Sequence, residues 1–244
     1  MSALLHVERL SKRFGGFTAL QEVDLEVQAG ERLGLIGPNG SGKSTLVNCI
    51  CGTLRNEQGS VRFDGVEMNW LTAHQRTRRG LARSFQLPRP FGSLTLAENL
   101  RIPILYTVNA RDGQALAGPA LLARCLELLA QVGLADKAHR LPRDLTQIEM
   151  RKLELARAMA AAPKLLIADE AMAGLSHAEV DEIIALLIRL NGQGVTVIMI
   201  EHIMRAVMEF SQRLAVLVAG RKIADGNPKD VVRDPEVVRA YLGE

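Results

Sequence analysis

Hydrophobic and polar positions along the chain alternate between the two-residue period of β-strands and the longer period of α-helices. Near the start, residues 25–27 have the alternation of a half-buried strand, and residues 32–36 resemble a buried one. A glycine-rich turn at residues 37–45 and a helix-compatible run at residues 46–51 follow directly. The first fifty residues therefore predict a sheet that leads through a turn into a helix.

The middle of the chain has mainly the helical period. Residues 60–63 predict a strand that ends in an Asp-Gly turn, and residues 73–79 predict a short basic helix. Between residues 94 and 134 the period is helical, apart from a polar, glycine-containing loop at residues 109–118. We therefore expect a helical insert after the first strands.

Strands and helices alternate again in the second half. The pattern predicts strands at residues 165–169 and 195–200, and helices at residues 147–161 and 177–190. Such alternation indicates a parallel sheet with both faces covered by helices. The pattern then predicts a hairpin and a closing helix, at residues 213–218 with 221–224 and at residues 235–242.

Composition and charge narrow the function classes. A chain of 244 residues can form one large domain, or a core with a smaller subdomain. The 48% hydrophobic and 23% charged residues are typical of a folded globular protein. The 30 Lys and Arg residues against 27 Asp and Glu residues leave a net charge of only +3. This small excess does not favour a surface for nucleic acid or another polyanion.

The chain has no predicted membrane span or export signal. Its longest hydrophobic stretch, residues 115–135, is interrupted by Arg124 and Glu127, whereas a bilayer span needs roughly 20 apolar residues. Charged side chains near the N-terminus stand where a secretory signal has an apolar stretch: Glu8, Arg9, Lys12 and Arg13.

The three cysteines, Cys49, Cys51 and Cys125, are odd in number and lack the spacings of a zinc or redox site. We expect them to be buried thiols of a protein in a reducing cytosol.

The glycine-rich turn has the spacing of a phosphate-binding loop. Gly37 is separated by four residues from Gly42, Lys43 and Ser44, and the whole turn lies between a predicted strand and a predicted helix. In this order, backbone N–H groups converge on phosphate oxygens at a helix N-terminus. Lys43 is expected to reach the β- and γ-phosphates, and the Ser44 hydroxyl to bind Mg²⁺. The candidate nucleotide-binding residues here are Gly37, Pro38, Asn39, Gly40, Ser41, Gly42, Lys43, Ser44 and Thr45.

A phosphate loop needs an acidic metal partner at the end of a hydrophobic strand, and Asp169 and Glu170 follow such a strand. Asp169 is expected to hold Mg²⁺ through water, and Glu170 to polarise the attacking water. One acid at a strand end is more often structural or a helix cap. The pair, in a chain with a phosphate loop, favours catalysis.

The order of these motifs resembles that of the nucleotide-binding subunit of ABC transporters over essentially the whole chain. The residues that carry this resemblance are GPNGSGKST, Ser84-Phe85-Gln86, Leu145-Thr146-Gln147-Ile148-Glu149, LLIADE, AGLS and Ile200-Glu201-His202. Within that family, four further segments are similar to the ATPase subunit of branched-chain amino-acid importers: FGGFTAL, FQLPRPF, IEHIMRAVM and DPEVVRAYLGE.

The resemblance implies an α/β fold of the P-loop ABC ATPase type, with a RecA-like core, an antiparallel β subdomain and a helical subdomain. Residues 1–90 and 163–244 would form the core, and residues 91–162 the helical subdomain. It further implies ATP and Mg²⁺ as cofactors, and a peripheral location on the cytoplasmic side of the membrane. The implied partners are transmembrane permease subunits, a second ABC ATPase subunit, and a periplasmic or extracellular substrate-binding protein that acts through the permease.

The resemblance also assigns residues outside the phosphate loop. Gln86 becomes the glutamine that approaches Mg²⁺ and the attacking water and senses the membrane subunit. His202 becomes the histidine that contacts the γ-phosphate, although alone it would be an ordinary histidine at a helix start. Phe14 matches the aromatic residue that stacks on adenine. Phe17 is a rival for that role, and either ring could belong to the core.

The family signature, Leu-Ser-Gly-Gly-Gln, is altered in this chain. Its place is taken by Leu145 and, after it, Thr146, Gln147, Ile148 and Glu149. Thr146 keeps a hydroxyl that can cap the helix, whereas Ile148 adds bulk and Glu149 adds negative charge where a phosphate is expected. Because the signature acts on the partner's nucleotide across a dimer, a heterodimer would have one weak site and a homodimer two. The alternative is that a subgroup of the family uses a different signature sequence with a geometry of its own, so that neither site is weak.

The sequence leaves several other functions open. An ATPase subunit of a lipopolysaccharide-type exporter has a similar C-terminal extension. A soluble ABC ATPase would normally show tandem domains or a strongly basic surface, and a non-hydrolysing regulatory subunit would not need Glu170 and His202. A basic stretch before Gln86 is either a solvated face or part of a permease contact: His74, Arg76, Arg78, Arg79 and Arg83.

Overall fold

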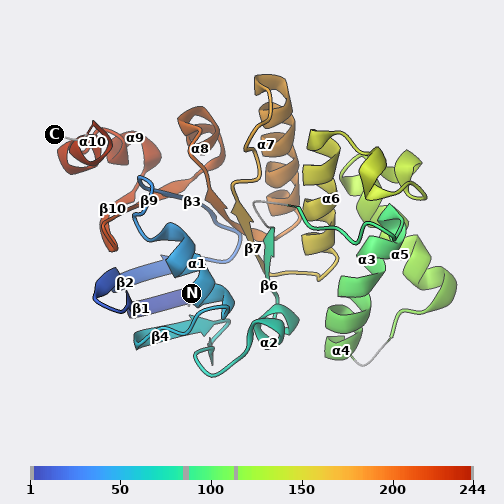
Figure 1. Cartoon of the computed structure of the whole chain (residues 1–244), viewed down its shortest axis with the longest axis horizontal. Helices are drawn as coiled ribbons and strands as arrows, with labels where there is room; N and C mark the ends of the chain where they lie inside the picture. Colours follow the sequence, from blue (N-terminus) through green and yellow to red (C-terminus); the bar gives the residue numbers. More distant parts are fainter. Residues whose placement is uncertain (1–2, 85–87, 113–114, 243–244) are drawn as a thin grey trace.

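The computed structural model describes residues 3–84, 88–112 and 115–242. Within them the strands form two sheets, and α1 (Lys43–Cys51) contacts both (Figure 1). One sheet is antiparallel and the other is mainly parallel. The predicted α/β fold with an antiparallel β subdomain is confirmed in these residues.

The antiparallel sheet has the strand order β2-β1-β4-β5. Its strands are β1 (Leu5–Phe14), β2 (Phe17–Val27), β4 (Gln58–Phe63) and β5 (Val66–Glu67). The sequence pattern missed β1 and most of β2. Both strands shift register, and Arg9 and Glu22 adopt left-handed backbone conformations at these shifts. Such bulges interrupt the two-residue alternation that identifies a strand.

The second sheet has the order β10-β9-β3-β8-β7-β6, in which every neighbouring pair except β10 and β9 is parallel. Its strands are β3 (Arg32–Ile36), β6 (Leu81–Ser84), β7 (Leu165–Asp169), β8 (Thr196–Ile200), β9 (Arg213–Val218) and β10 (Arg221–Gly226). The predicted parallel sheet and C-terminal hairpin are confirmed, whereas the four-residue β6 was not predicted.

Helices pack against the parallel sheet (Figure 1). The longer ones are α3 (Leu96–Pro103), α5 (Gly118–Gln131), α6 (Gln147–Met159), α7 (His177–Gly192) and α10 (Pro235–Leu242). The shorter ones are α2 (Ala73–Arg78), η1 (Ile104–Val108), α4 (Asn109–Asp112), η2 (Ala135–Lys137), η3 (Pro142–Asp144), α8 (Met204–Phe210) and α9 (Pro228–Val231). The helices α3, α4 and α5 form the end of the molecule opposite α9 and α10 (Figure 1). The predicted helical insert is confirmed, although its expected loop begins as α4.

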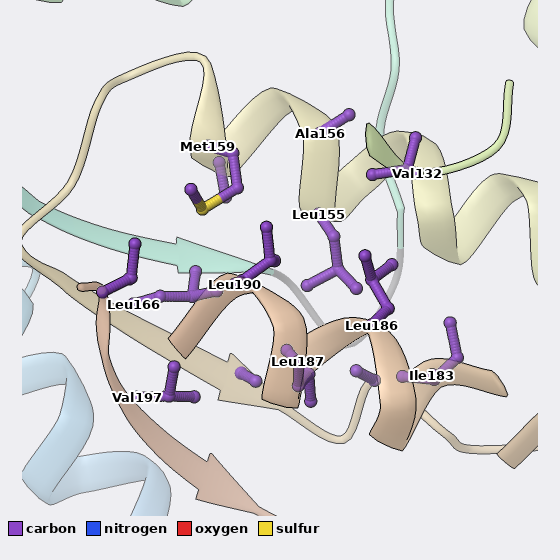
Figure 2. Packing of buried hydrophobic residues seen from close by; sticks show 14 of the residues in the cluster. Val132, Leu155, Ala156, Met159, Leu166, Ile183, Leu186, Leu187, Leu190 and Val197 are labelled. Carbon is purple, nitrogen blue, oxygen red and sulfur yellow. The ribbon is translucent and has the colours of Figure 1, made fainter. Parts of the chain in front are cut away.

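Both faces of the parallel sheet are buried. Along β7, Leu165 and Ile167 pack into a cluster with α1 and the antiparallel sheet, whereas Leu166 and Ala168 pack into a cluster with α6 and α7. Figure 2 shows the second cluster, in which Leu155 of α6 lies close to the side chains of α7. This packing holds the C-terminal end of β7 rigidly, and the acidic pair lies at that end.

The larger cluster includes residues of α3, α5 and α6 as well as β7 and β8. The division at residues 90/91 and 162/163 therefore stays a prediction. No helix in the described part of the chain is long and apolar enough for a bilayer span. Cys49, Cys51 and Cys125 are buried free thiols, as predicted.

Candidate nucleotide site

The phosphate loop connects β3 to α1, and its glycines permit close backbone packing. A Cβ atom on Gly37 would lie 2.1 Å from the carbonyl oxygen of Leu217, and one on Gly42 would lie 2.7 Å from that of Ala19. Gly42 also has a φ of 105°, which side chains disfavour. The Ser41 carbonyl accepts a hydrogen bond of 2.9 Å from the N–H of Gly220. The hairpin after β9 thus supports the loop.

Lys43 lies inside the curve of this loop. Its Nζ donates to the carbonyl oxygens of Gly37 at 2.7 Å and Pro38 at 3.1 Å, and contacts Ser41 Oγ at 3.4 Å. Burial lowers the pKa of Lys43, and the carboxylates of Glu170 and Asp169 act in the opposite direction. The ammonium group is therefore held where phosphate oxygens are expected to bind.

A cavity of about 280 Å³ brings the predicted site residues together. Its lining comprises Phe14, Phe17, Ala19, Asn39, Gly40, Ser41, Gly42, Lys43, Ser44, Thr45, Glu170 and His202. Gly37 and Pro38 belong to the same loop through their bonds to Lys43. Phe14 and Phe17 are both exposed at this cavity, so the interpretation that they are core residues is wrong. Both remain candidates for contact with the adenine ring.

The acidic strand end and the histidine form a hydrogen-bonded pair. Glu170 Oε1 lies 3.0 Å from His202 Nε2, although 32 residues separate them in sequence. Glu170 has a φ of 48°, a left-handed conformation that costs a non-glycine residue on the order of 1 kcal/mol. Its N–H donates to the carbonyl oxygen of Ile200 at 2.9 Å. The protein therefore holds Glu170 in a strained conformation beside His202.

Asp169 forms a buried ion pair that the sequence did not reveal. Its Oδ2 lies 2.5 Å from Arg83 Nη2, and Arg83 Nη1 donates to Asn48 Oδ1 at 2.7 Å. Asn48 lies on α1, the helix of the phosphate loop. Arg83 therefore connects the end of β7 to that helix. The pairing follows from the register of β6 and β7, in which Arg83 lies opposite Ile167.

The basic stretch before residue 86 is not one solvated face. The Arg76 side chain is buried, with 2% exposed, and donates to the carbonyl oxygens of Cys49 and Ile50. Arg83 pairs with Asp169, so His74, Arg78 and Arg79 are the three members that are exposed.

Comparison with known proteins agrees with this geometry. Residues 20–173 match the ABC transporter family. The chain belongs to this family. Residues 221–244 match the branched-chain amino acid ATP-binding cassette transporter family. The high-affinity branched-chain amino acid transport ATP-binding proteins BraF of Pseudomonas aeruginosa and LivG of Escherichia coli are 37% and 36% identical to the chain. Each alignment covers 99% of this chain and 98% of the relative.

Solved structures give the same result. MJ1267, an ATP-binding cassette of an ABC transporter solved in its ADP conformation, has a TM-score of 0.89 and 30% sequence identity. That match covers the whole of both chains. The predicted P-loop ABC ATPase fold is therefore confirmed, and the chain is an ATPase of the ABC transporter family.

The residues present suit a magnesium ion in this ABC ATPase. Ser44 lines the cavity with a hydroxyl, and Asp169 supplies a carboxylate beside the loop that bears Glu170. The described residues contain no group of three or more His, Cys, Asp or Glu that could hold a metal ion by itself. Mg²⁺ at nucleotide sites typically takes one or two protein ligands together with phosphate oxygens and waters. Gln86, the other predicted ligand, lies outside the described residues.

The altered ABC signature lies at the N-terminus of α6, and none of Thr146, Gln147, Ile148 and Glu149 lines the cavity. Thr146 and Glu149 form a capping box, in which the Thr146 N–H donates to Glu149 Oε2 at 3.0 Å. Glu149 Oε1 also lies 2.5 Å from Lys137 Nζ, and this bond lowers the pKa of Glu149. Lys137 therefore compensates part of the negative charge that Glu149 was expected to bring towards a phosphate.

Ile148 is half-buried and packs against the larger hydrophobic cluster. With Glu149 paired to Lys137, the bulk of Ile148 is the stronger argument against phosphate binding at this helix N-terminus. We therefore expect the two signature changes to differ in effect. Ile148→Gly should raise ATP-driven dimerisation or turnover several-fold, and should lower the free energy of unfolding by about 2 kcal/mol through lost packing and helix propensity.

Glu149→Gln is the matched comparison. It keeps a capping-box side chain but removes the ion pair with Lys137, so we expect unchanged turnover and a stability loss of about 0.5 kcal/mol. Urea unfolding and ATPase assays of both variants measure these effects. A larger gain in turnover from Glu149→Gln than from Ile148→Gly would restore the charge argument.

Proposed function

We propose that this ABC ATPase drives uptake of branched-chain or related amino acids, as a peripheral subunit on the cytoplasmic side of the membrane. The main support is the full-length similarity to BraF and LivG, together with the C-terminal match. It would act with permease subunits, with a second ATPase subunit, and with a substrate-binding protein that works through the permease. Co-purification from membranes and identification of the bound permease tests this proposal.

The geometry supports specific roles for the site residues in ATP hydrolysis. The N–H groups at the start of α1 and the Lys43 ammonium would bind the phosphates, and Phe14 or Phe17 would contact the adenine. Bound Mg²⁺ would neutralise developing charge on the phosphates, held by Ser44 and by Asp169 through water, with Gln86 as the further candidate. Glu170 would polarise the attacking water, and His202 would hold the Glu170 carboxylate and contact the γ-phosphate.

An apolar groove of about 350 Å³ is the surface we assign to the permease. It lies between α2, β6, the α3–η1 segment and α6, and the exposed aromatic rings of Phe91 and Tyr106 form part of its lining. Arg83 lines the same groove and pairs with Asp169, so an occupant of the groove would contact a residue that reaches the end of β7 where we propose that Mg²⁺ binds. A cytoplasmic segment of the permease with an apolar face fits this surface.

We predict that Tyr106→Asp weakens assembly with the permease by at least about tenfold, because the charge would have to be buried against an apolar partner. ATP affinity should be unchanged. Trp70→Asp is the matched control, since Trp70 is an exposed aromatic residue outside the groove lining. Pull-down of the permease measures assembly. Equal losses in the two variants would contradict the assignment of the groove.

The exposed pair Arg78 and Arg79 lies beside this groove, and Arg78 Nε donates to the Tyr106 carbonyl at 3.2 Å. The double substitution Arg78→Glu with Arg79→Glu is measured in the same permease pull-down. We expect it to weaken assembly with the permease without changing the affinity for ATP.

Export of a lipopolysaccharide-type substrate is the second candidate. The lipopolysaccharide export system ATP-binding protein LptB of Haemophilus influenzae is 31% identical, and that alignment covers 99% of this chain and 98% of the relative. The higher identity to BraF and LivG favours amino-acid uptake. The identity of the co-purified permease decides between the two.

A further inference from the structure

A buried carboxylate bridges the two backbone segments that bear the proposed catalytic pair. Glu201 directly follows β8, and only 3% of the residue is exposed. Its Oε1 accepts a hydrogen bond of 2.9 Å from the N–H of Met172, and its Oε2 accepts one of 3.3 Å from the N–H of His202. One carboxylate thus joins the turn that bears Glu170 to the segment that bears His202.

The turn after β7 needs such support. Glu170 has a left-handed backbone conformation, and strained positions of this kind persist only where their surroundings fix them. The Glu170 N–H is bonded to Ile200, the last residue of β8, and the Met172 N–H is bonded to Glu201. The backbone of the strained turn is therefore tied to the C-terminal end of β8 twice, once at Glu170 itself and once two residues later at Met172.

Arg151 adds a connection from the signature helix. It is a buried residue of α6, and its Nη2 donates to the carbonyl oxygen of Ala173 at 3.1 Å. Arg151 and Glu201 also attract each other electrostatically. Burial raises the pKa of Glu201, and its two backbone hydrogen bonds oppose that rise. The carboxylate is thus held by hydrogen bonds from the β7 turn and the histidine segment, and Arg151 of α6 adds electrostatic attraction.

We propose that Glu201 is a positioning residue, which sets the geometry between the Glu170 carboxylate and the His202 imidazole for attack by water. This inference rests on the proposed roles of Glu170 and His202. It gives Glu201 no contact with the nucleotide, because Glu201 is buried and does not line the cavity.

Conservative substitutions should break this arrangement. In Glu201→Gln, one of the two N–H groups would face an amide NH₂ group, which cannot accept its hydrogen bond. In Glu201→Asp, the shorter side chain could not reach both N–H groups. A displacement of the reacting groups by about 1 Å can cost roughly 100-fold in rate. We expect kcat for ATP hydrolysis to fall about 10- to 100-fold in both variants, with the KM for ATP changed by less than about threefold.

The experiment compares these two variants with Glu31→Gln and Glu170→Gln in the assembled transporter. Glu31 is a matched control, because its carboxylate also accepts a backbone N–H, from Gln28, and pairs with Arg213 away from the cavity. ATPase kinetics are measured together with fluorescent ATP binding and thermal unfolding. NMR of the imidazole of His202, in the full chain without nucleotide, reports the local geometry independently of turnover.

A fall in kcat with retained ATP binding and a shifted His202 resonance, absent in Glu31→Gln, supports the inference. Unchanged kcat in both Glu201 variants overturns it, as does a loss of turnover that merely parallels lost folding and lost ATP binding. If Glu201→Gln does not fold, Glu201→Asp decides by the same criteria. Retained hydrolysis in Glu170→Gln would instead refute the proposed function of the pair, which keeps the two failures distinct.

Discussion

Replacing Glu170 with Gln should reduce ATP hydrolysis by at least about 100-fold, with ATP binding retained. The substitution keeps the size of the side chain but removes the carboxylate that would polarise the attacking water. The backbone N–H of Glu170, which bonds to Ile200, is unaffected. Because nucleotide would still bind but not be cleaved, the variant should accumulate an ATP-bound dimer.

Single-turnover hydrolysis and size-exclusion chromatography with ATP measure these two effects. Glu179→Gln is a suitable control, since Glu179 is a half-buried carboxylate in the first turn of α7, outside the cavity lining, and Gln can replace it in the capping box. Hydrolysis near the rate of the unchanged protein in Glu170→Gln would remove Glu170 from the mechanism. The hydrogen bond between His202 and Glu170 would then have no role in the proposed attack by water.

The sequence predicted the parts of the site that depend on short segments. The phosphate loop directly follows a predicted strand, and Asp169 and Glu170 stand at the end of another, so each motif is visible within a short segment of sequence. The parallel sheet then places the ends of β3, β7 and β8 along one edge. This topology explains why His202 meets Glu170, a contact that was not predicted from the sequence.

The contacts that the sequence did not reveal depend on register between distant segments. Arg83 and Asp169 are 86 residues apart, and only the pairing of β6 with β7 brings them together. From the sequence, Arg83 therefore belongs to a basic stretch that is either a solvated face or part of a permease contact. In the sequence Glu201 is only a neighbour of His202, because its role depends on the Met172 N–H at the end of the next strand. Lys137 likewise neutralises Glu149 through a fold-dependent contact.

Lys43→Met should weaken ATP binding by about 10- to 100-fold, which corresponds to a charge-assisted hydrogen bond of roughly 1.5–3 kcal/mol. The ammonium group already lies within the loop, bound to the carbonyl oxygens of Gly37 and Pro38, so little rearrangement is needed for it to reach phosphate oxygens. Met has a similar length without the charge. Lys164→Met is the control, because Lys164 pairs with Asp64 outside the cavity lining.

In an assembled heterodimer, this substitution also tests the altered signature. The signature of this chain would act on the partner's phosphate loop, whereas Lys43 would act with the partner's signature. If Ile148 slows the site that it joins, the site built on Lys43 is the faster one. Turnover should then fall more when Lys43 is replaced than when the equivalent lysine of the partner is replaced. The opposite order, measured as steady-state ATPase of the two mixed dimers, would mean that α6 of this chain supports the faster site despite Ile148.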